Sequence, residues 1–223
     1  MYSTSESSEP IESQSGQLLA AANLSRLLAD VFWEPLLLDA SSLGHLRQAA
    51  SSLGPNFLQA VLVAEREQEG QSVQELRLLY AKLFLGPFEL MAAPYASVYL
   101  EGDEAFSGNT RDYLMDLYGR GGFRLPAKAG DLPDHLAVEL EFVYLMLARY
   151  LQFGDEAALG LAQEMAEHMA SWLPQWQRTL VLIPQAKYYY PFGDLALSLP
   201  PALLAALSAS GAWESNPAGA GRS

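Results

Sequence analysis

The sequence contains no cysteine among its 223 residues. Disulfide bonds, zinc–thiolate sites, iron–sulfur clusters and thiol chemistry are therefore excluded. Histidine is also scarce, with three residues in the whole chain. Because imidazole and thiolate are the usual ligands of structural and catalytic metal sites, this composition favours a protein that holds no metal and no cofactor of its own.

Basic residues are few. The chain has 13 Lys and Arg against 26 Asp and Glu, which gives a formal net charge of −13. A protein this acidic repels phosphate backbones, so we expect no nucleic-acid partner. A basic peptide is a more natural partner for such a surface.

The first 16 residues lack both a basic start and an apolar stretch, so they do not resemble a secretory signal, and we expect a cytoplasmic protein. The only long uncharged run, residues 195–213, contains Pro200 and Pro201, which disfavour a membrane span. We expect no stable membrane insertion. The composition predicts a disordered leader over 1–16, a helical domain over 17–213 and a disordered tail over 214–223.

Apolar residues make up 50% of the chain, and they recur with the period of an α-helix. Ser72 and Glu75 form a capping box, in which each end of the motif bonds the backbone of the other. Prolines predict that a helix from Glu156 ends near Ser171 and that the last helix begins at Pro201. The pattern predicts an all-α fold, a single compact multi-helix domain of about nine or ten helices.

One predicted helix carries several ionisable groups near its start. Asp131 or Asp134 can cap it, Pro133 fits its first turn, and His135 and Glu139 share one face because they are four residues apart. These residue types suit a small metal-dependent hydrolase. The other two histidines lie on separate helices without a partnered ligand motif. The structural alternative is a network in which Asp134 and Glu139 orient His135.

Three separated stretches together resemble the redox-enzyme maturation chaperones of the TorD/DmsD/NarJ-like family. The first joins YAKLFLGP at 80–87 to PYASVY at 94–99, the second is LPDHLAVELEF at 132–142, and the third is HMASWLPQW at 168–176. The Pro-Asp-His-Leu block is the most specific part. The resemblance extends over about residues 24–207.

The resemblance implies an all-helical, non-enzymatic chaperone for the catalytic subunit of a molybdopterin-dependent oxidoreductase. Such chaperones bind the leader peptide of the client, often a twin-arginine signal peptide, and hold the client for cofactor insertion before export or assembly. The molybdenum cofactor belongs to the client. Two motifs carry over to this chain as candidate peptide-binding residues. They are Tyr95, Ser97 and Tyr99 from the loop motif, and Asp131, Asp134, His135 and Glu139 from the acidic helix-start motif.

The chemistry of a leader peptide agrees with this assignment. Guanidinium groups pair with carboxylates through charge-assisted hydrogen bonds, and the apolar part of a leader needs an apolar groove. Three alternatives remain open. The client is a respiratory reductase subunit that is not exported and has no twin arginines; the chain is a hydrolase that uses Asp134, His135 and Glu139; or it is a helical adaptor with no client.

Overall fold

The computed structural model describes residues 9–85, 91–102, 108–127 and 132–208. Within these ranges it contains nine α-helices and no strand, apart from an isolated antiparallel bridge between Tyr95 and His135. The prediction of a single all-α domain is therefore confirmed. The helices are α1 (Glu9–Trp33), α2 (Ala40–Leu53), α3 (Pro55–Gln68), α4 (Val73–Tyr80), α5 (Ala96–Leu100), α6 (Asn109–Gly121), α7 (Leu136–Phe153), α8 (Glu156–Val181) and α9 (Tyr190–Ser208). A π-helical turn η1 (Ala81–Leu85) follows α4, and a 3₁₀ turn η4 (Pro184–Tyr188) joins α8 to α9.

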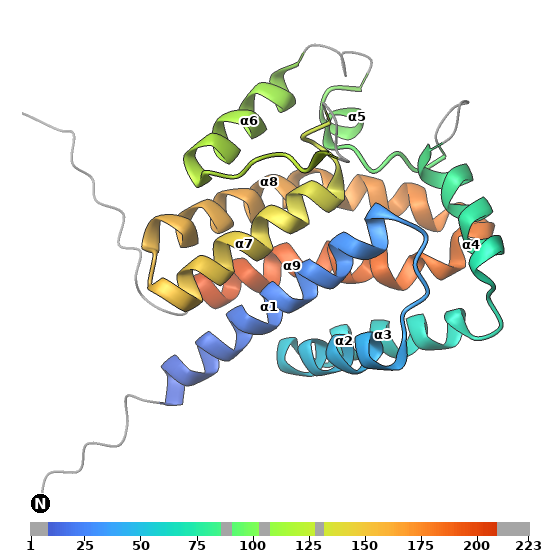
Figure 1. Ribbon diagram of the computed structural model, residues 1–223, viewed down its shortest axis with the longest axis horizontal. Helices are drawn as coiled ribbons and strands as arrows, with labels where there is room; N and C mark the ends of the chain where they lie inside the picture. The colour runs from blue at the N-terminus through green and yellow to red at the C-terminus, as the bar shows by residue number, and fades with distance from the viewer. Residues whose placement is uncertain (1–8, 86–90, 103–107, 128–131, 209–223) are drawn as a thin grey trace, which may run out of the picture.

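Four long helices form the centre of the molecule. α1 packs along α7, and α8 packs against both α7 and α9. The α2–α3 hairpin covers α1 and α9 on one side, while α5 and α6 lie on α8 at the opposite side (Figure 1). α4 lies at one end of the bundle. The bundle thus leaves α5 on the outside, held against α8.

The core is continuous and rich in aromatic rings. Phe32 lies with its ring edge-on to Phe84 and Trp176, and Tyr189 contacts both Phe32 and Phe84. All four side chains are fully buried, so they join α1, η1, α8 and the residue between η4 and α9. Burial of large aromatic rings is the main favourable term for packing these elements.

By length and composition α9 is apolar enough to cross a membrane. Half of that window is buried within the protein, where α9 contacts α8, α1 and α3. Its apolar character therefore has an explanation in the core of the bundle.

The first helix begins earlier than the sequence predicts. α1 starts at Glu9, inside the segment that composition assigns to a disordered leader. Pro10 falls in the first turn, where its missing N–H costs nothing. The side-chain amide of Gln14 donates to the carbonyl oxygen of Ala206 at 3.0 Å, which ties the start of α1 to the end of α9. The predicted tail, 214–223, lies outside the described residues.

Two expectations based on proline are wrong. α8 continues past Ser171 and through Pro174 to Val181, and α9 runs through Pro200 and Pro201 from a start at Tyr190. An internal proline costs about 3 kcal/mol in an isolated helix. Here large side chains near each proline are buried, Trp172 and Trp176 in α8 and Leu199 and Leu203 in α9, so packing offsets that cost.

The capping box at the start of α4 is confirmed. The backbone N–H of Glu75 donates to Oγ of Ser72 at 3.2 Å, and the Ser72 N–H donates to Oε2 of Glu75 at 3.1 Å. α4 then passes directly into η1, so the two form one continuous helical rod over 73–85.

Candidate functional site

The two sequence motifs meet where the chain before α5 lies against the start of α7. The N–H of Ala96 donates to the carbonyl oxygen of Asp134 at 3.0 Å, and the N–H of Leu136 donates to that of Pro94 at 2.9 Å. These two bonds flank the bridge between Tyr95 and His135. The loop motif and the helix-start motif are therefore brought into direct contact.

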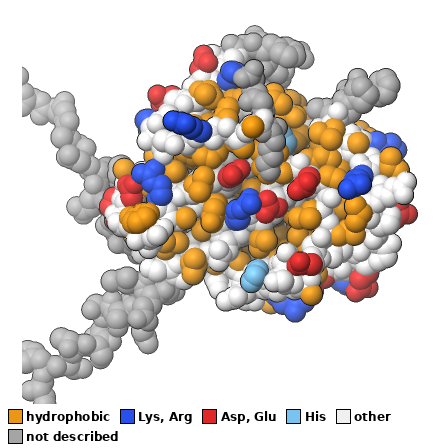
Figure 2. All heavy atoms as spheres, in the orientation of Figure 1, with side chains coloured by type: hydrophobic (Ala, Val, Ile, Leu, Met, Phe, Trp, Pro, Cys, Tyr) orange, Lys and Arg blue, Asp and Glu red, His pale blue; other side chains and the backbone are white. Residues whose placement is uncertain are grey.

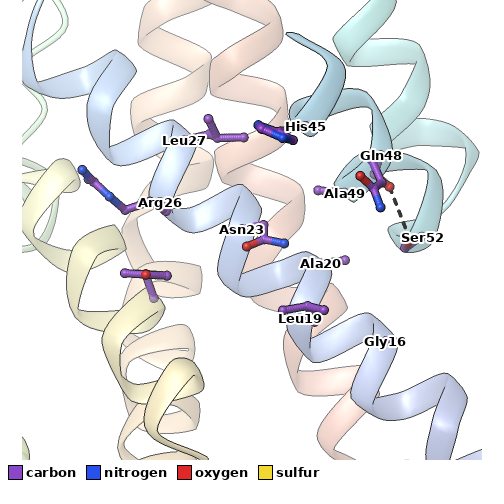
Figure 3. A pocket seen from close by; sticks show the side chains of 11 residues that line it. Gly16, Leu19, Ala20, Asn23, Arg26, Leu27, His45, Gln48, Ala49 and Ser52 are labelled. Carbon is purple, nitrogen blue, oxygen red and sulfur yellow. Dashed lines mark hydrogen bonds between the residues drawn. The ribbon is translucent and has the colours of Figure 1, made fainter. Parts of the chain in front are cut away.

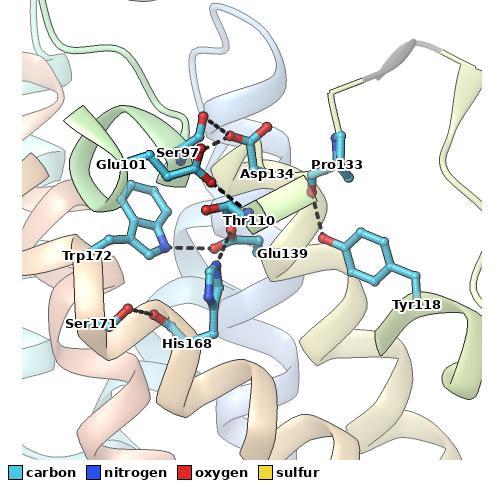
Figure 4. Close-up of polar contacts among 10 residues, drawn as sticks. All are labelled: Ser97, Glu101, Thr110, Tyr118, Pro133, Asp134, Glu139, His168, Ser171 and Trp172. Atoms are coloured by element: carbon cyan, nitrogen blue, oxygen red, sulfur yellow. Dashed lines mark hydrogen bonds and ion pairs between the residues drawn. The ribbon is translucent and has the colours of Figure 1, made fainter. Parts of the chain in front are cut away.

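Asp134 caps α5 rather than α7, so the cap predicted for α7 is wrong. Its Oδ2 atom accepts hydrogen bonds from the backbone N–H of Ser97 at 3.1 Å and from the Ser97 hydroxyl at 2.6 Å (Figure 4). A carboxylate at a helix N-terminus satisfies unpaired N–H groups and complements the helix dipole. The other predicted cap, Asp131, lies outside the described residues.

His135 takes the capping position of α7. Its Nδ1 atom accepts from the N–H of Ala137 at 3.1 Å, which places no proton on that nitrogen. The imidazole stacks on Trp33, with centroids 5.0 Å apart and planes at 7°, and Tyr95 contacts it edge-on at 5.1 Å. Asp134 hydrogen-bonds Ser97, and Glu139 hydrogen-bonds His168, so both carboxylates bind residues other than His135.

Glu139 forms a buried ion pair with His168, which the sequence placed in the third motif but not among the candidate peptide-binding residues. Its side chain is 0% exposed, and Oε1 lies 3.1 Å from Nε2 of His168. The other oxygen accepts from Nε1 of Trp172 at 3.1 Å, so both partners come from α8 (Figure 4). His168 and Trp172 are four residues apart and share one face of α8, and this spacing is the feature of the sequence that could have indicated their common partner.

The charges of this pair are set by opposing effects. Burial raises the pKa of Glu139 above its ordinary value, while His168 and Trp172 favour the ionised carboxylate. Burial lowers the pKa of His168, but the Glu139 carboxylate outweighs this and leaves the His168 pKa raised. The charged pair joins α7 to α8 beneath α5 and α6.

Aromatic side chains cover this region from α5 and α6. Tyr99 stacks on Trp172 with centroids 5.9 Å apart, and burial raises the pKa of Tyr99 to about 12. Tyr113 lies against the His168 ring at 5.4 Å, and burial raises its pKa to about 12 as well. Both phenols therefore stay protonated near neutral pH and can act as hydrogen-bond donors.

We name Ser97, Asp134, Glu139, His168 and Trp172 the polar cluster. Its members differ in accessibility. Asp134 is 7% exposed and Glu139 is fully buried, while Ser97 is half-buried, as are the neighbouring Tyr95 and Tyr99. In this conformation the α5 side of the polar cluster is open to solvent, whereas Glu139 is closed off from it.

Exposed apolar side chains lie next to the polar cluster, and sequence reasoning did not identify them. Val98 and Leu100 flank Tyr99 on α5, Leu132 precedes Pro133, and Met91 precedes the buried Ala92. We name these four residues the apolar rim. Exposed clusters of large apolar side chains are unusual on a monomer and are typical of interaction sites.

A separate groove of about 410 Å³ lies between α1 and α2 (Figure 3). Leu19, Asn23 and Arg26 of α1 line it together with His45 of α2 and Tyr144 of α7. It shares no residue with either motif. In the part of the chain that the structure describes, no three His, Asp or Glu side chains are grouped to hold a metal ion.

The comparisons with known proteins agree with the motifs. The family model described as nitrate reductase delta subunit matches residues 43–178, from α2 into α8. Chaperone protein TorD of Vibrio cholerae serotype O1 is 27% identical over 153 residues, which cover 66% of this chain and 69% of that protein. The probable Tat proofreading chaperone DmsD of Haemophilus influenzae is 28% identical over 124 residues, or 56% of this chain and 58% of that protein.

These relatives are named as chaperones and not as enzymes. The hydrolase alternative is set aside for that reason, and its three residues Asp134, His135 and Glu139 each bond a different partner. The family model spans more than half of the chain and includes both motifs and the polar cluster. The chain belongs to the nitrate reductase delta subunit family, which includes the TorD and DmsD chaperones.

Proposed function

We propose that this protein is a cytoplasmic, system-specific chaperone that binds the leader peptide or N-terminal region of a molybdopterin oxidoreductase subunit. It holds that subunit until the cofactor is inserted, before export or assembly. The names of its relatives support the chaperone role, and the name of the DmsD relative refers to proofreading of the Tat pathway. The molybdenum cofactor is part of the client.

The observation that carries the proposal is the position of the apolar rim beside a carboxylate. Val98 and Leu100 lie on the same short helix, α5, that Asp134 caps. A twin-arginine leader presents guanidinium groups followed by an apolar stretch, and such a surface offers a partner for each.

The accessibility of each residue refines its proposed role. Tyr95, Ser97 and Tyr99 are half-buried and would contact the peptide directly, with Asp134 at the edge of the surface. His135 and Glu139 are buried and would act by holding α7 and α8 in place. The assignment of Asp131 rests on the sequence motif alone.

The expected affinity is moderate. Ordering a disordered leader on binding costs about 2–5 kcal/mol of the gross interaction energy. A chaperone must also release its client, which a very tight complex would prevent. Salt should weaken the complex, because the accessible part of an arginine–carboxylate pair is screened.

Calorimetry with synthetic leader peptides of the host's molybdopterin oxidoreductases tests the proposal. We expect one leader to bind the full chain, and the double change Val98→Ser with Leu132→Ser to weaken binding about tenfold or more, because apolar contact is lost. Asp134→Asn should weaken it about tenfold too, since charge-assisted bonds contribute roughly 1.5–3 kcal/mol. Phe153→Ser, at an exposed apolar residue at the end of α7, is the matched control and should bind normally.

Two outcomes would overturn the proposal. One is that no leader binds at concentrations where the chain is folded by circular dichroism. The other is that the apolar-rim variant binds as tightly as the control, which would place the binding surface elsewhere on the protein.

A second candidate function has support from the description of the matching family, which names a nitrate reductase subunit. In that case the client is a respiratory reductase subunit that is not exported. Leader peptides in which both arginines are replaced by lysine or alanine distinguish an exported client from a non-exported one. Loss of binding favours an exported client, and unchanged binding favours a non-exported one.

A further inference from the structure

The outer face of the α4–η1 rod carries large apolar side chains with no partner in the bundle. Leu78 is 68% exposed and Leu85 is 61% exposed. The inner face of the same rod is buried against the aromatic core through Tyr80 and Phe84. The rod is therefore fixed in place by one face, and the leucines of the other face project into solvent.

Cations accompany these leucines. Arg77 and Lys82 are exposed on the same rod, and Lys82 follows Leu78 by one helical turn. Neither forms an ion pair with another described residue, although four other arginines of the chain do so. The one carboxylate of α4, Glu75, is bonded to Ser72 in the capping box.

A second segment repeats this combination at the same end of the molecule. Leu182, just after α8, is 79% exposed, Val181 beside it is exposed too, and Arg178 and Lys187 are exposed without an ion-pair partner in the described chain. The two segments are neighbours, because Phe84 of η1 contacts the Tyr189 ring directly after η4, at 5.0 Å.

We define the basic apolar end as Arg77, Leu78, Lys82 and Leu85 together with Arg178, Val181, Leu182 and Lys187. Figure 2 shows hydrophobic and basic side chains side by side over the part of the molecule where α4 lies. Its four cations contrast with the chain as a whole, which carries a formal net charge of −13. These four cations attract a negative surface that the acidic remainder of the chain repels.

We propose that the basic apolar end docks the protein reversibly on an anionic lipid surface. Basic side chains interspersed with projecting leucines are the combination that binds at a membrane interface, where cations meet headgroups and leucines enter the acyl boundary. An acidic peptide is the weaker alternative, because the apolar side chains here project outward from a helical rod rather than lining a groove. This docking is peripheral and needs no spanning helix.

The inference goes beyond the proposed function and does not depend on it. The polar cluster and apolar rim lie at α5 and the chain before it, the start of α7 and the middle of α8, and they share no residue with the basic apolar end. A chain docked through α4 and η1 keeps those surfaces free, so a leader and a lipid surface do not compete for the same side chains.

Flotation with vesicles tests the proposal. The full chain is mixed with vesicles of phosphatidylglycerol and phosphatidylcholine in equal parts, or of phosphatidylcholine alone, and the bound fraction is measured after centrifugation. We expect the chain to float with the anionic vesicles only and to be released by raised salt. Leu78→Ser with Lys82→Glu should reduce the bound fraction about tenfold or more, since apolar contact and attraction are both lost.

The matched control is Phe153→Ser with Arg124→Glu. This control removes one exposed apolar side chain, Phe153, and reverses one exposed cation, Arg124, both away from α4. It therefore changes the net charge by the same amount as the Leu78→Ser and Lys82→Glu variant. It should float like the unmodified chain, and circular dichroism should show both variants folded. Equal loss in both variants, flotation with neutral vesicles to the same extent, or no flotation at all would overturn the proposal. So would binding to polyglutamate without binding to vesicles, which would identify an acidic protein segment as the partner.

Discussion

Replacing Glu139 by alanine should be one of the most destabilising single changes in this protein. The carboxylate is 0% exposed and accepts from Nε2 of His168 and Nε1 of Trp172, both at 3.1 Å. Alanine leaves the imidazole and the indole N–H without an acceptor in a buried position. Removing one partner of a buried ion pair costs about 3–5 kcal/mol, a large share of a total stability of about 5–15 kcal/mol.

Glu139→Gln removes the charge of the side chain but keeps its size and shape, so it measures the contribution of the charge alone. The amide keeps an oxygen for the Trp172 indole but removes the attraction to a protonated His168, so we expect a loss of about 1–2 kcal/mol. The surface control is Glu164→Ala, which breaks a pair with Arg120 that is partly open to solvent. Exposed pairs contribute about 0–1 kcal/mol, so this change should be nearly neutral.

Urea unfolding followed by circular dichroism measures these differences from the midpoint, with an unchanged slope as evidence that the comparison is valid. A double-mutant cycle with His168→Ala adds the coupling energy, which should exceed about 1 kcal/mol because the two residues share one interaction. If Glu139→Ala costs less than about 1 kcal/mol, or if the two changes are additive, the pair does not hold α7 to α8 and the reasoning fails.

Two further predictions concern the same bundle. The pKa of His168 is raised in the folded protein, so the stabilisation from its charge is fully present below the ordinary value of 6.5 and is lost as the pH rises through the raised value. The free energy of unfolding should therefore fall as the pH rises above 6.5. His168→Gln should remove that part of the slope, and an unchanged slope would contradict the assignment. Gly193→Ala would place a Cβ atom 2.1 Å from Oε1 of Gln177 and 2.9 Å from Cδ2 of Leu180. We expect it to lower the melting midpoint with a cost of about 1–3 kcal/mol. The control is Gly160→Ala on α8, where an added Cβ atom would meet nothing within 4 Å, so this change should be neutral or stabilising. Equal effects at the two sites would refute the packing argument.

The features that the sequence predicted correctly depend on neighbours along the chain. The capping box needs only Ser72 and Glu75, and the all-α fold needs only the helical period of the apolar residues. Proline signals are local too, and they failed at Pro174 because packing from distant helices outweighs the local penalty.

The sequence predicted only part of the polar cluster, because its contacts join residues that are far apart along the chain. Its motif residues could be listed, but the bond from Ser97 to Asp134 joins residues 37 apart, and Glu139 finds His168 at a separation of 29. A local cap for α7 and a distant cap for α5 use the same residue type, so only the packing of α5 decides between them. The motif also gives no information on exposure, which in the structure separates Ser97 and Tyr99 from the buried Glu139.

The most direct test of the proposed chaperone role is to identify what the protein holds in its own cell. The chain would be tagged, purified from its host after brief cross-linking, and analysed by mass spectrometry, with the Val98→Ser and Leu132→Ser variant processed in parallel. The account predicts that the catalytic subunit of a molybdopterin oxidoreductase is enriched with the unmodified chain, cross-linked through its N-terminal region, and depleted with the variant. Recovery of no such subunit, or equal recovery with the variant, would contradict it.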